Sequence, residues 1–357
     1  MNFSKTLKEL EQNHLYRQIK VADDRAVDFC SNDYLGLKNH PQVITAFKSG
    51  ADKYGVGAGA SHLINGHTGA HQELEEALAD YTGQQKALLF STGYMANIGV
   101  FSALKSELDW ALQDKLNHAS LIDANHLIGL PLQRYLHNNI GALESKIVKQ
   151  TGQGLIATDG VFSMDGDRAD IVAIATIAAK SSALVLQDDA HGFGVFASNI
   201  PQHSIYMATL GKAAGTMGAF VAGDADFIDF LAQKSRPYIY TTALAPALCV
   251  ATLKSLELIK NGAQNDKLQS NIDFFQKLYK EFELPILSSN SAIMPLIIAG
   301  NQRVIKVAQT LLDKGFKVGA IRSPTVATGS ERLRITLSAK HTHKQIQQLI
   351  EQIKNAL

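Results

Sequence analysis

Short apolar runs alternate with helical patterns through the middle of the chain. Four of these runs have the length and composition of buried strands: residues 86–90, 154–160, 183–189 and 204–211. Residues 170–180, between the second run and the third, carry helical spacing, and an earlier helical stripe stops at Gly83, a residue typical of helix C-caps. Strand, helix and strand in this order predict a mostly parallel sheet with helices on both faces, which is an α/β fold.

The carboxyl-terminal part follows a different pattern. Residues 304–311 place apolar side chains on one helical stripe, and residues 342–357 predict an amphipathic helix with Thr342 as its N-cap. Between them, residues 332–338 alternate strictly, with Arg332 and Arg334 on the polar face. This alternation predicts a half-buried strand, and the whole part predicts a smaller α+β domain.

These patterns divide the chain into three parts. Residues 1–35 contain an amphipathic helix that we expect to pack with the small domain. Residues 36–245 are predicted to form a large ligand-binding domain, and residues 246–357 the small carboxyl-terminal domain. Two domains agree with the length of 357 residues, at about 150 residues per domain.

Charge and cysteine content narrow the class of protein. Lys and Arg number 34 against 33 Asp and Glu, so neither a nucleic acid nor a membrane surface is an expected partner. Cys30 and Cys249 lack CxxC spacing and predict reduced thiols. The most apolar window is interrupted by Lys180 and two serines, and residues 1–20 hold no apolar core of a signal peptide. We therefore expect a cytoplasmic protein.

Unusual polar clusters follow the predicted strands, where ligands bind in parallel α/β sheets. After the first strand, Ser91, Thr92, Gly93 and Tyr94 open a helix, whose free N–H groups and dipole favour a phosphate. An ordinary capped helix is the alternative, and this motif alone favours it.

The third strand ends in Asp188 and Asp189, followed by His191. The two carboxylates are expected to point to opposite sides of the strand, so they cannot both bind the same metal ion. Asp188 and His191 alone supply few converging ligands for a metal. A metal, an organic cation and plain helix capping all remain open from this spacing.

Lys212 follows the fourth strand and is surrounded by small residues, Gly211, Ala213, Ala214 and Gly215. A lysine in such a loop can approach a carbonyl carbon closely, and if the amine is partly desolvated its pKa falls and it becomes a nucleophile. A solvated surface lysine is the alternative. Pyridoxal 5′-phosphate (PLP) needs a binding site for its phosphate, a partner for its ring nitrogen and a lysine that reacts with its aldehyde. The helix start after the first strand, the carboxylate at the strand end and Lys212 together meet these three needs.

Motifs along almost the whole chain resemble those of the α-oxoamine synthases: CSNDYLGL, TDGVFSMDGD, DDAHGFGV, TLGKAAG and AIRSPTVATGSERLRITLSA. The resemblance implies a fold-type-I PLP-dependent transferase, with a mostly parallel seven-stranded sheet between helices and a smaller α+β domain. Enzymes of this family condense an amino acid with an acyl thioester and release carbon dioxide. No metal is implied.

Four further motifs are similar to one branch of that family: GVGAGASHLINGH, NHASLIDA, IYTTALAP and SAIMPLII. This branch joins L-alanine to a pimeloyl thioester early in biotin synthesis and releases 8-amino-7-oxononanoate, carbon dioxide and the free thiol. The thioester is pimeloyl-CoA or pimeloyl acyl-carrier protein, and the sequence does not distinguish the two. The resemblance also implies a homodimer with shared active sites.

Catalytic and cofactor roles follow from the resemblance. Lys212 is expected to form the Schiff base with PLP, and Asp188 to pair with the pyridine nitrogen. His191 would contact the phenolic oxygen of the cofactor, and His118 would stack on its ring. Further cofactor contacts are expected from Gly93, Tyr94, Ser163 and Thr209, and from Thr242 to the phosphate of the neighbouring subunit.

Substrate roles are implied in the same way. Arg334 is expected to bind the carboxylate of the amino acid, since its planar fork suits that group. Asn32, Thr325 and Arg17 are further candidates on the substrate side. Arg332 is interpreted as a solvent-facing strand arginine.

Two alternatives and one departure stay open. A sister synthase that uses glycine, such as 2-amino-3-oxobutyrate ligase or 5-aminolevulinate synthase, has the same chemistry. A PLP-binding protein that has lost turnover is the alternative from another class. Phe193 stands where the family more often has a small hydroxyl residue, so it either narrows the pocket or packs outward.

Overall fold

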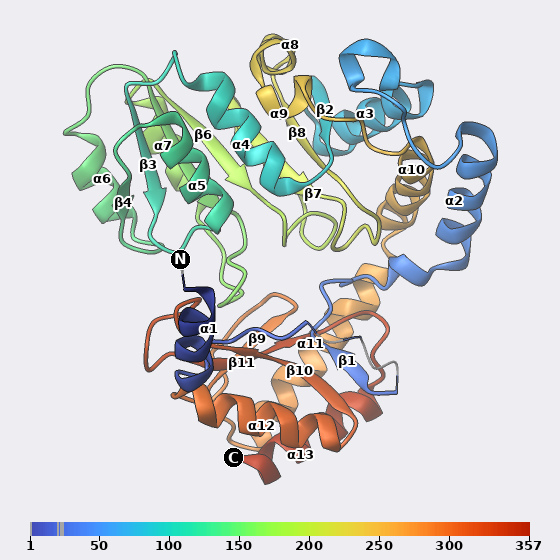
Figure 1. Ribbon diagram of the computed structural model, residues 1–357, viewed down its shortest axis with the longest axis vertical. Coiled ribbons are helices and arrows are strands. Elements are labelled where there is room, and N and C mark those ends of the chain that lie inside the picture. Colours follow the sequence, from blue (N-terminus) through green and yellow to red (C-terminus); the bar gives the residue numbers. More distant parts are fainter. Residues whose placement is uncertain (1, 20, 22–24) are drawn as a thin grey trace. The chain divides into compact units, whose positions relative to one another are not determined.

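The computed structural model describes residues 2–19, 21 and 25–357, which fall into two compact units (Figure 1). The terminal unit combines the residues up to Tyr34, the loop Met164–Asp167 and the segment Asp266–Leu357. The central unit comprises Leu35–Ser163 and Arg168–Asn265. Among the described residues, no helix is both long and apolar enough to cross a membrane.

The central unit is built on a seven-stranded sheet with the order β2-β8-β7-β6-β5-β3-β4. Its strands are β2 (Lys86–Phe90), β3 (Trp110–Asp114), β4 (Gln133–Tyr135), β5 (Gly154–Asp159), β6 (Ala183–Asp188), β7 (Ser204–Thr209) and β8 (Ala219–Gly223). Strands β4, β3, β5, β6 and β7 pair in parallel, and β8 runs antiparallel to both of its neighbours. The predicted mostly parallel sheet is confirmed, and the four predicted strands are β2, β5, β6 and β7.

Helices cover both faces of this sheet. The helices of the central unit are η1 (Leu37–Asn39), α2 (Pro41–Tyr54), η2 (His62–Gly66), α3 (Gly69–Thr82), α4 (Gly93–Leu104), α5 (Ala119–Ile128), α6 (Ile140–Ile147), α7 (Ile171–Ala179), α8 (Ala225–Lys234), α9 (Arg236–Ile239) and α10 (Pro246–Asn261). Along β5, Leu155 and Ala157 face the core under α4, α5 and α8, whereas Ile156 faces the core under α6 and α7. This alternation explains why successive residues of β5 are apolar as far as Ala157.

Helix α10 belongs to the central unit, although the sequence pattern placed the domain boundary at Pro246. It packs along α2 and also contacts α3. The approach to α2 is so close that a Cβ atom on Gly50 would lie 2.8 Å from the Cα atom of Ala247. The compact terminal unit therefore resumes at Asp266.

The terminal unit has a four-stranded sheet with the order β1-β10-β11-β9. Its elements are α1 (Phe3–Gln12), β1 (Val27–Phe29), most of α11 (Ala263–Glu281), β9 (Ile293–Ile297), α12 (Asn301–Asp313), β10 (Phe316–Ile321), β11 (Arg332–Thr336) and α13 (His343–Ala356). The predicted N-cap is confirmed, since Thr342 Oγ1 accepts the Gln345 N–H at 3.2 Å and Gln345 Oε1 accepts the Thr342 N–H at 2.9 Å.

Strand β11 is buried on both faces, so the predictions of a half-buried strand and a solvent-facing Arg332 were wrong. Arg332 and Arg334 are only 6% and 7% exposed. The Arg332 guanidinium forms an ion pair with Asp165 and donates to the Met164 carbonyl oxygen at 3.5 Å. The loop Met164–Asp167 thus supplies the polar partners that allow Arg332 to be buried.

His341 connects the two ends of the chain within the terminal unit. Its ring stacks on Phe29 with centroids 3.9 Å apart. Nδ1 accepts the Ser338 N–H at 3.1 Å, and Nε2–H donates to the Asp28 carbonyl oxygen at 3.1 Å. Burial lowers the pKa of His341 to about 4, because loss of solvent disfavours the charged ring, and the hydrogen bond to the Asp28 carbonyl oxygen offsets only part of this effect.

Stability should therefore fall in mildly acidic solution. The unfolded chain binds a proton at His341 below about pH 6.5 while the folded chain does not, so this site should remove about 2 kcal/mol of stability between pH 7 and pH 5. Urea unfolding of wild type and His341→Gln at both pH values measures this, and the variant should show the shallower pH dependence. His126→Gln, at an exposed position of α5, is the control. An unchanged pH slope in His341→Gln would contradict the assignment.

Candidate active site

A pocket of about 140 Å³ lies at the carboxyl edge of the central sheet. It is lined by Gly93, Tyr94, His118, Ser120, Asp159, Val161, Ser163, Asp188, Ala190, His191, Met207, Thr209 and Lys212. Eight residues singled out from the sequence meet here: Gly93, Tyr94, His118, Ser163, Asp188, His191, Thr209 and Lys212. They come from different strand ends, because parallel strands all end at the same edge.

Asp188, the last residue of β6, is 4% exposed. Its Oδ2 accepts the side-chain N–H of Asn97 at 2.7 Å, and its Oδ1 accepts the Ala190 N–H at 3.1 Å. Asn97 lies inside α4 and also donates to Ser120 Oγ at 2.8 Å. These donors fix the orientation of the carboxylate at the base of the pocket.

Asp189 points away from the pocket lining. Its Oδ2 accepts the Tyr206 O–H at 2.8 Å. Burial raises the pKa of Asp189 to about 7, partly offset by that hydrogen bond. Cβ atoms on Gly160 and Gly192 would lie 2.5 and 2.1 Å from Asp189 Oδ1, so this carboxyl group is enclosed by backbone. The Asp189 carboxyl group therefore has a structural role, because it connects the end of β6 to Tyr206 on β7.

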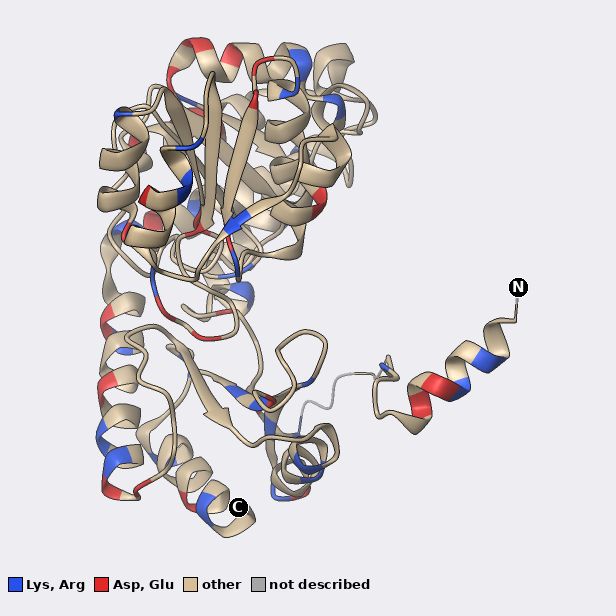
Figure 2. Cartoon of the chain, turned by 90° about the vertical axis from the view of Figure 1, so that its left-hand side faces the viewer, with Lys and Arg blue, Asp and Glu red and all other residues tan. Residues whose placement is uncertain are grey.

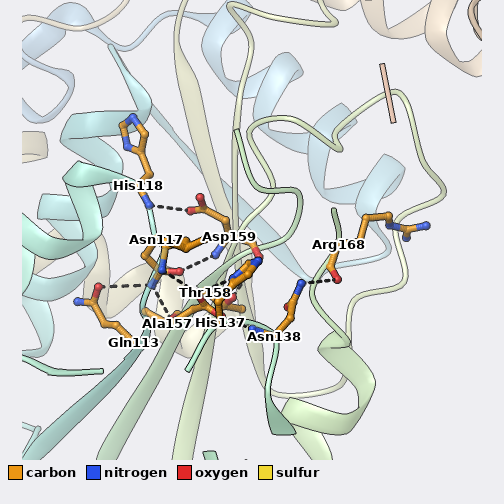
Figure 3. A network of polar contacts seen from close by, with 11 residues as sticks. Gln113, Asn117, His118, His137, Asn138, Ala157, Thr158, Asp159 and Arg168 are labelled. Carbon is orange, nitrogen blue, oxygen red and sulfur yellow. Dashed lines mark hydrogen bonds and ion pairs between the residues drawn. The ribbon is translucent and has the colours of Figure 1, made fainter. Parts of the chain in front are cut away.

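His118 is held by a network that links the end of β3 to β5 (Figure 3). Asn117 donates to the Ala157 carbonyl oxygen at 2.8 Å and accepts the Asp159 N–H at 3.1 Å. The His118 N–H donates to Asp159 Oδ1 at 3.3 Å. Desolvation lowers the pKa of His118, with Asp188 acting in the opposite direction and Lys212 lowering it further. A neutral imidazole therefore faces the pocket.

Asp159 is a pocket residue that the sequence reasoning missed. It is 4% exposed and stands opposite Asp188 in the register of β5 and β6. Burial first, and the charge of Asp188 second, raise the pKa of Asp159 well above its ordinary value. The signal was available, since Asp159 ends a predicted strand just as Asp188 does.

The amino terminus of α4 forms another wall of the pocket. Thr92 is the N-cap, and its Oγ1 accepts the Met95 N–H at 3.2 Å. Tyr94 forms a short hydrogen bond to Asp123 on α5. The N–H groups of the first turn and the helix dipole suit an anion at this wall.

Lys212 follows β7 in a turn beside Thr209. The Thr209 hydroxyl donates to the Gly218 carbonyl oxygen at 3.0 Å and accepts the Gly211 N–H at 3.3 Å. The neighbouring Ala213 and Ala214 side chains are buried. These hydrogen bonds and buried side chains hold the turn in place, and Lys212 lines the pocket from this turn.

Phe193 does not line the pocket. It is 1% exposed, and its ring makes edge contacts with Tyr81 and Phe220 at centroid distances of 5.5 and 5.2 Å. Of the two alternatives for this residue, packing away from the pocket is the one observed.

The remaining predicted residues lie elsewhere. Thr242 belongs to the central unit but not to the pocket lining, and its carbonyl oxygen accepts the Ser91 hydroxyl at 3.5 Å. The four substrate-side candidates lie in the terminal unit and form two pairs. Both Arg334 terminal nitrogens donate to Asn32 Oδ1 at 3.1 Å, and Arg17 Nη2 donates to Thr325 Oγ1 at 3.3 Å.

Comparison with known proteins agrees with this geometry. A family model described as aminotransferase class I and II matches residues 24–353. An 8-amino-7-oxononanoate synthase from Ectopseudomonas mendocina is 49% identical over an alignment of 346 positions that covers 94% of this chain and 89% of that protein. One from Pseudomonas fluorescens is 47% identical, with 94% and 92% covered.

Two solved structures show the same fold. The 8-amino-7-oxononanoate synthase of Francisella tularensis has a TM-score of 0.81 and 32% identity, with 93% of this chain and 98% of that chain covered. A serine palmitoyltransferase from S. paucimobilis, solved with PLP and myriocin bound, has a TM-score of 0.91 and 27% identity, with 99% and 96% covered.

Fold and pocket define a PLP-dependent enzyme of fold type I, as predicted. The chain belongs to the aminotransferase class I and II family and, within it, to the 8-amino-7-oxononanoate synthases, which are PLP-dependent acyltransferases of biotin synthesis.

The pocket residues fit this cofactor. PLP carries an anionic phosphate, a protonated ring nitrogen and an aldehyde carbon. The α4 amino terminus, the buried Asp188 carboxylate and Lys212 match these groups in charge and reactivity. The imidazole of His118 offers a flat face to a ring.

Asn97→Ala should weaken PLP binding about tenfold, because the buried Asp188 loses a hydrogen-bond donor. Absorbance titration of the apoprotein with PLP measures the dissociation constant. Asn125→Ala is the matched control, since Asn125 is also a buried asparagine but donates to the Leu130 carbonyl oxygen at 2.8 Å. Equal PLP affinity in wild type and Asn97→Ala would show that Asn97 does not support the cofactor site.

Proposed function

We propose that this protein condenses L-alanine with a pimeloyl thioester, carried by CoA or by acyl-carrier protein, to give 8-amino-7-oxononanoate, carbon dioxide and free thiol. The main support is one pocket that joins Lys212, Asp188 and His118 in a chain 49% identical to a synthase of that name. The proposed setting is the cytoplasm.

When bound, PLP supplies an electron sink for negative charge that develops on the α-carbon of the amino acid. Asp188 is proposed to hold the positive charge of the ring nitrogen and so keep that sink effective. His118 is proposed to hold the ring from one face, and His191 to contact its phenolic oxygen. Gly93, Tyr94, Ser163 and Thr209 would complete the cofactor contacts.

Lys212 is proposed to bind the aldehyde carbon covalently and to act as the base once alanine replaces it there. Its amine would take the α-proton of alanine and later return a proton to the same carbon. The turn that carries Lys212 limits the directions from which its amine can reach this carbon.

Arg334 is proposed to bind the alanine carboxylate until carbon dioxide leaves. Its two terminal nitrogens are already oriented by Asn32, which lowers the entropy cost of a bidentate contact. Asn32, Thr325 and Arg17 are proposed as further residues on the substrate side.

A homodimer with shared active sites is also proposed, with Thr242 at the phosphate of the neighbouring subunit. Ile64 on η2 and Tyr240 after α9 support it, because these large apolar side chains are 79% and 71% exposed. The two segments are joined by the Ser61–Thr242 bridge. A dimer interface on these joined segments would cover both side chains.

Purified protein reconstituted with PLP should convert L-alanine and pimeloyl-CoA to 8-amino-7-oxononanoate, detected by mass spectrometry, and should have the mass of a dimer in light scattering. Lys212→Ala should keep the fold but lose turnover by at least about a thousandfold.

Turnover with glycine and acetyl-CoA but not with alanine would replace this proposal by the sister synthase. PLP binding without turnover of either amino acid would indicate a silent binding protein. A monomer that turns over normally would remove the shared-site proposal alone.

A further inference from the structure

A second hollow lies at the outer edge of the central sheet, beside the edge strand β4. This basic groove has a volume of about 690 Å³. It is lined by Lys115, Arg134, Tyr135, Leu136, Ala142, Ser145, Lys146 and Lys149. Figure 2 turns the α6 and β4 side toward the viewer and colours their Lys and Arg positions blue.

Four of the lining residues are cations and none is a carboxylate. Within the described part of the chain, Lys115, Arg134, Lys146 and Lys149 form no ion pair with the protein. Because the whole chain is nearly neutral, with 34 basic and 33 acidic residues, this is a local concentration of charge.

The helix dipole explains only part of this concentration. Lys146 lies in the last turn of α6, where a cation is stabilised by the carboxyl end of the helix. Arg134 lies on β4 and Lys115 follows β3, so the dipole of α6 does not explain them. Unpaired like charges that converge on one groove favour an anionic partner.

The groove also has exposed apolar side chains. Leu136, in its lining, is 57% exposed. Leu116 and Val148, next in sequence to two of the cations, are 47% and 78% exposed. Cations around exposed leucine and valine suit the acidic, partly apolar face of a helical protein, since a helix docks through its apolar side chains and rim charges select it.

The groove and the PLP pocket share no lining residue, but a segment of four residues, 115–118, links them: Lys115 lines the groove and His118 lines the pocket. Lys115 opens the turn that ends at His118, and the buried Asp114 ties the ends of β3 and β4 together. Asp114 Oδ1 accepts the Leu116 N–H at 2.8 Å and pairs with His137 Nδ1 at 2.9 Å, while Oδ2 accepts the Asn138 N–H at 2.9 Å. A partner in the groove therefore lies beside the turn that carries His118.

We propose that the basic groove is the docking surface for the acyl carrier protein that delivers the pimeloyl group. This inference rests on the proposed function and selects the carrier protein as acyl donor. Cations alone would equally suit the phosphates of CoA. The exposed Leu116, Leu136 and Val148 favour a protein, because a nucleotide phosphate gains nothing from them.

The test compares the two acyl donors in a charge-reversed groove. The variant combines Arg134→Glu, Lys146→Glu and Lys149→Glu, none of which has a proposed role in the PLP pocket. The matched control combines Lys105→Glu, Lys180→Glu and Lys234→Glu, which are exposed lysines of the central unit outside the groove and change the net charge equally.

The groove variant should raise KM for pimeloyl–acyl carrier protein by at least about tenfold, with KM for pimeloyl-CoA and kcat within about twofold of wild type. The control should leave all three unchanged. An unchanged KM for the carrier-protein donor would overturn the proposal, as would an equal loss with both donors, which indicates a phosphate subsite.

Binding of fluorescent apo acyl carrier protein, measured by anisotropy without PLP or alanine, separates this inference from the proposed function. Wild type and the control should bind it, and the groove variant should bind at least about tenfold more weakly. If wild type makes no product from either donor, the proposed function fails while anisotropy still decides the docking surface. Equal binding by wild type and the groove variant would overturn the docking surface.

Discussion

The buried carboxylate of Asp188 is the interaction on which the rest of the site depends. A carboxylate that is 4% exposed is costly unless hydrogen bonds and a cation compensate its lost hydration. Asn97 and the Ala190 N–H supply the hydrogen bonds, and the pocket beside Asp188 is where a cation must lie. The fold thus holds in place a negative charge that matches the protonated ring of PLP.

The adjacent residues Asp188 and Asp189 carry the same carboxyl group, but the two groups point in different directions at the strand end. Asp188 is directed to the pocket and to Asn97, whereas Asp189 is directed to Tyr206 and to the glycines around it. Successive side chains of an extended chain point to opposite faces, and the hydrogen bond from the Asp189 N–H to the Met207 carbonyl oxygen at 2.7 Å keeps the chain beside β7 at this point. One carboxyl group therefore serves the ligand and the other serves the fold.

Strands with continuous apolar composition could be predicted from the sequence, together with the polar residues that follow them. Strand β4 could not be predicted in this way, because it is an edge strand of only three residues and one of them is an exposed arginine. The burial of β11 could not be predicted either, since Arg332 is buried against Asp165, which lies far away in the sequence. Local pattern shows which side of a strand is polar but not which distant segment will cover it.

The same limit applies to the site. Lys212, Asp188 and His118 are marked by strand ends and by motifs, whereas Asn97 lies inside a mostly apolar helix and has no local signal. Asp159 did carry a signal, but its importance follows only from the strand register that places it beside Asp188.

The most direct test of this account is to reduce the PLP-loaded protein with borohydride and to locate the attached cofactor by peptide mass spectrometry. Borohydride makes the bond between the cofactor and its lysine permanent. The account predicts a single modified residue, Lys212, and no labelling of that peptide in Lys212→Ala. Attachment at another lysine, or no attachment in a protein that turns over alanine, would contradict it.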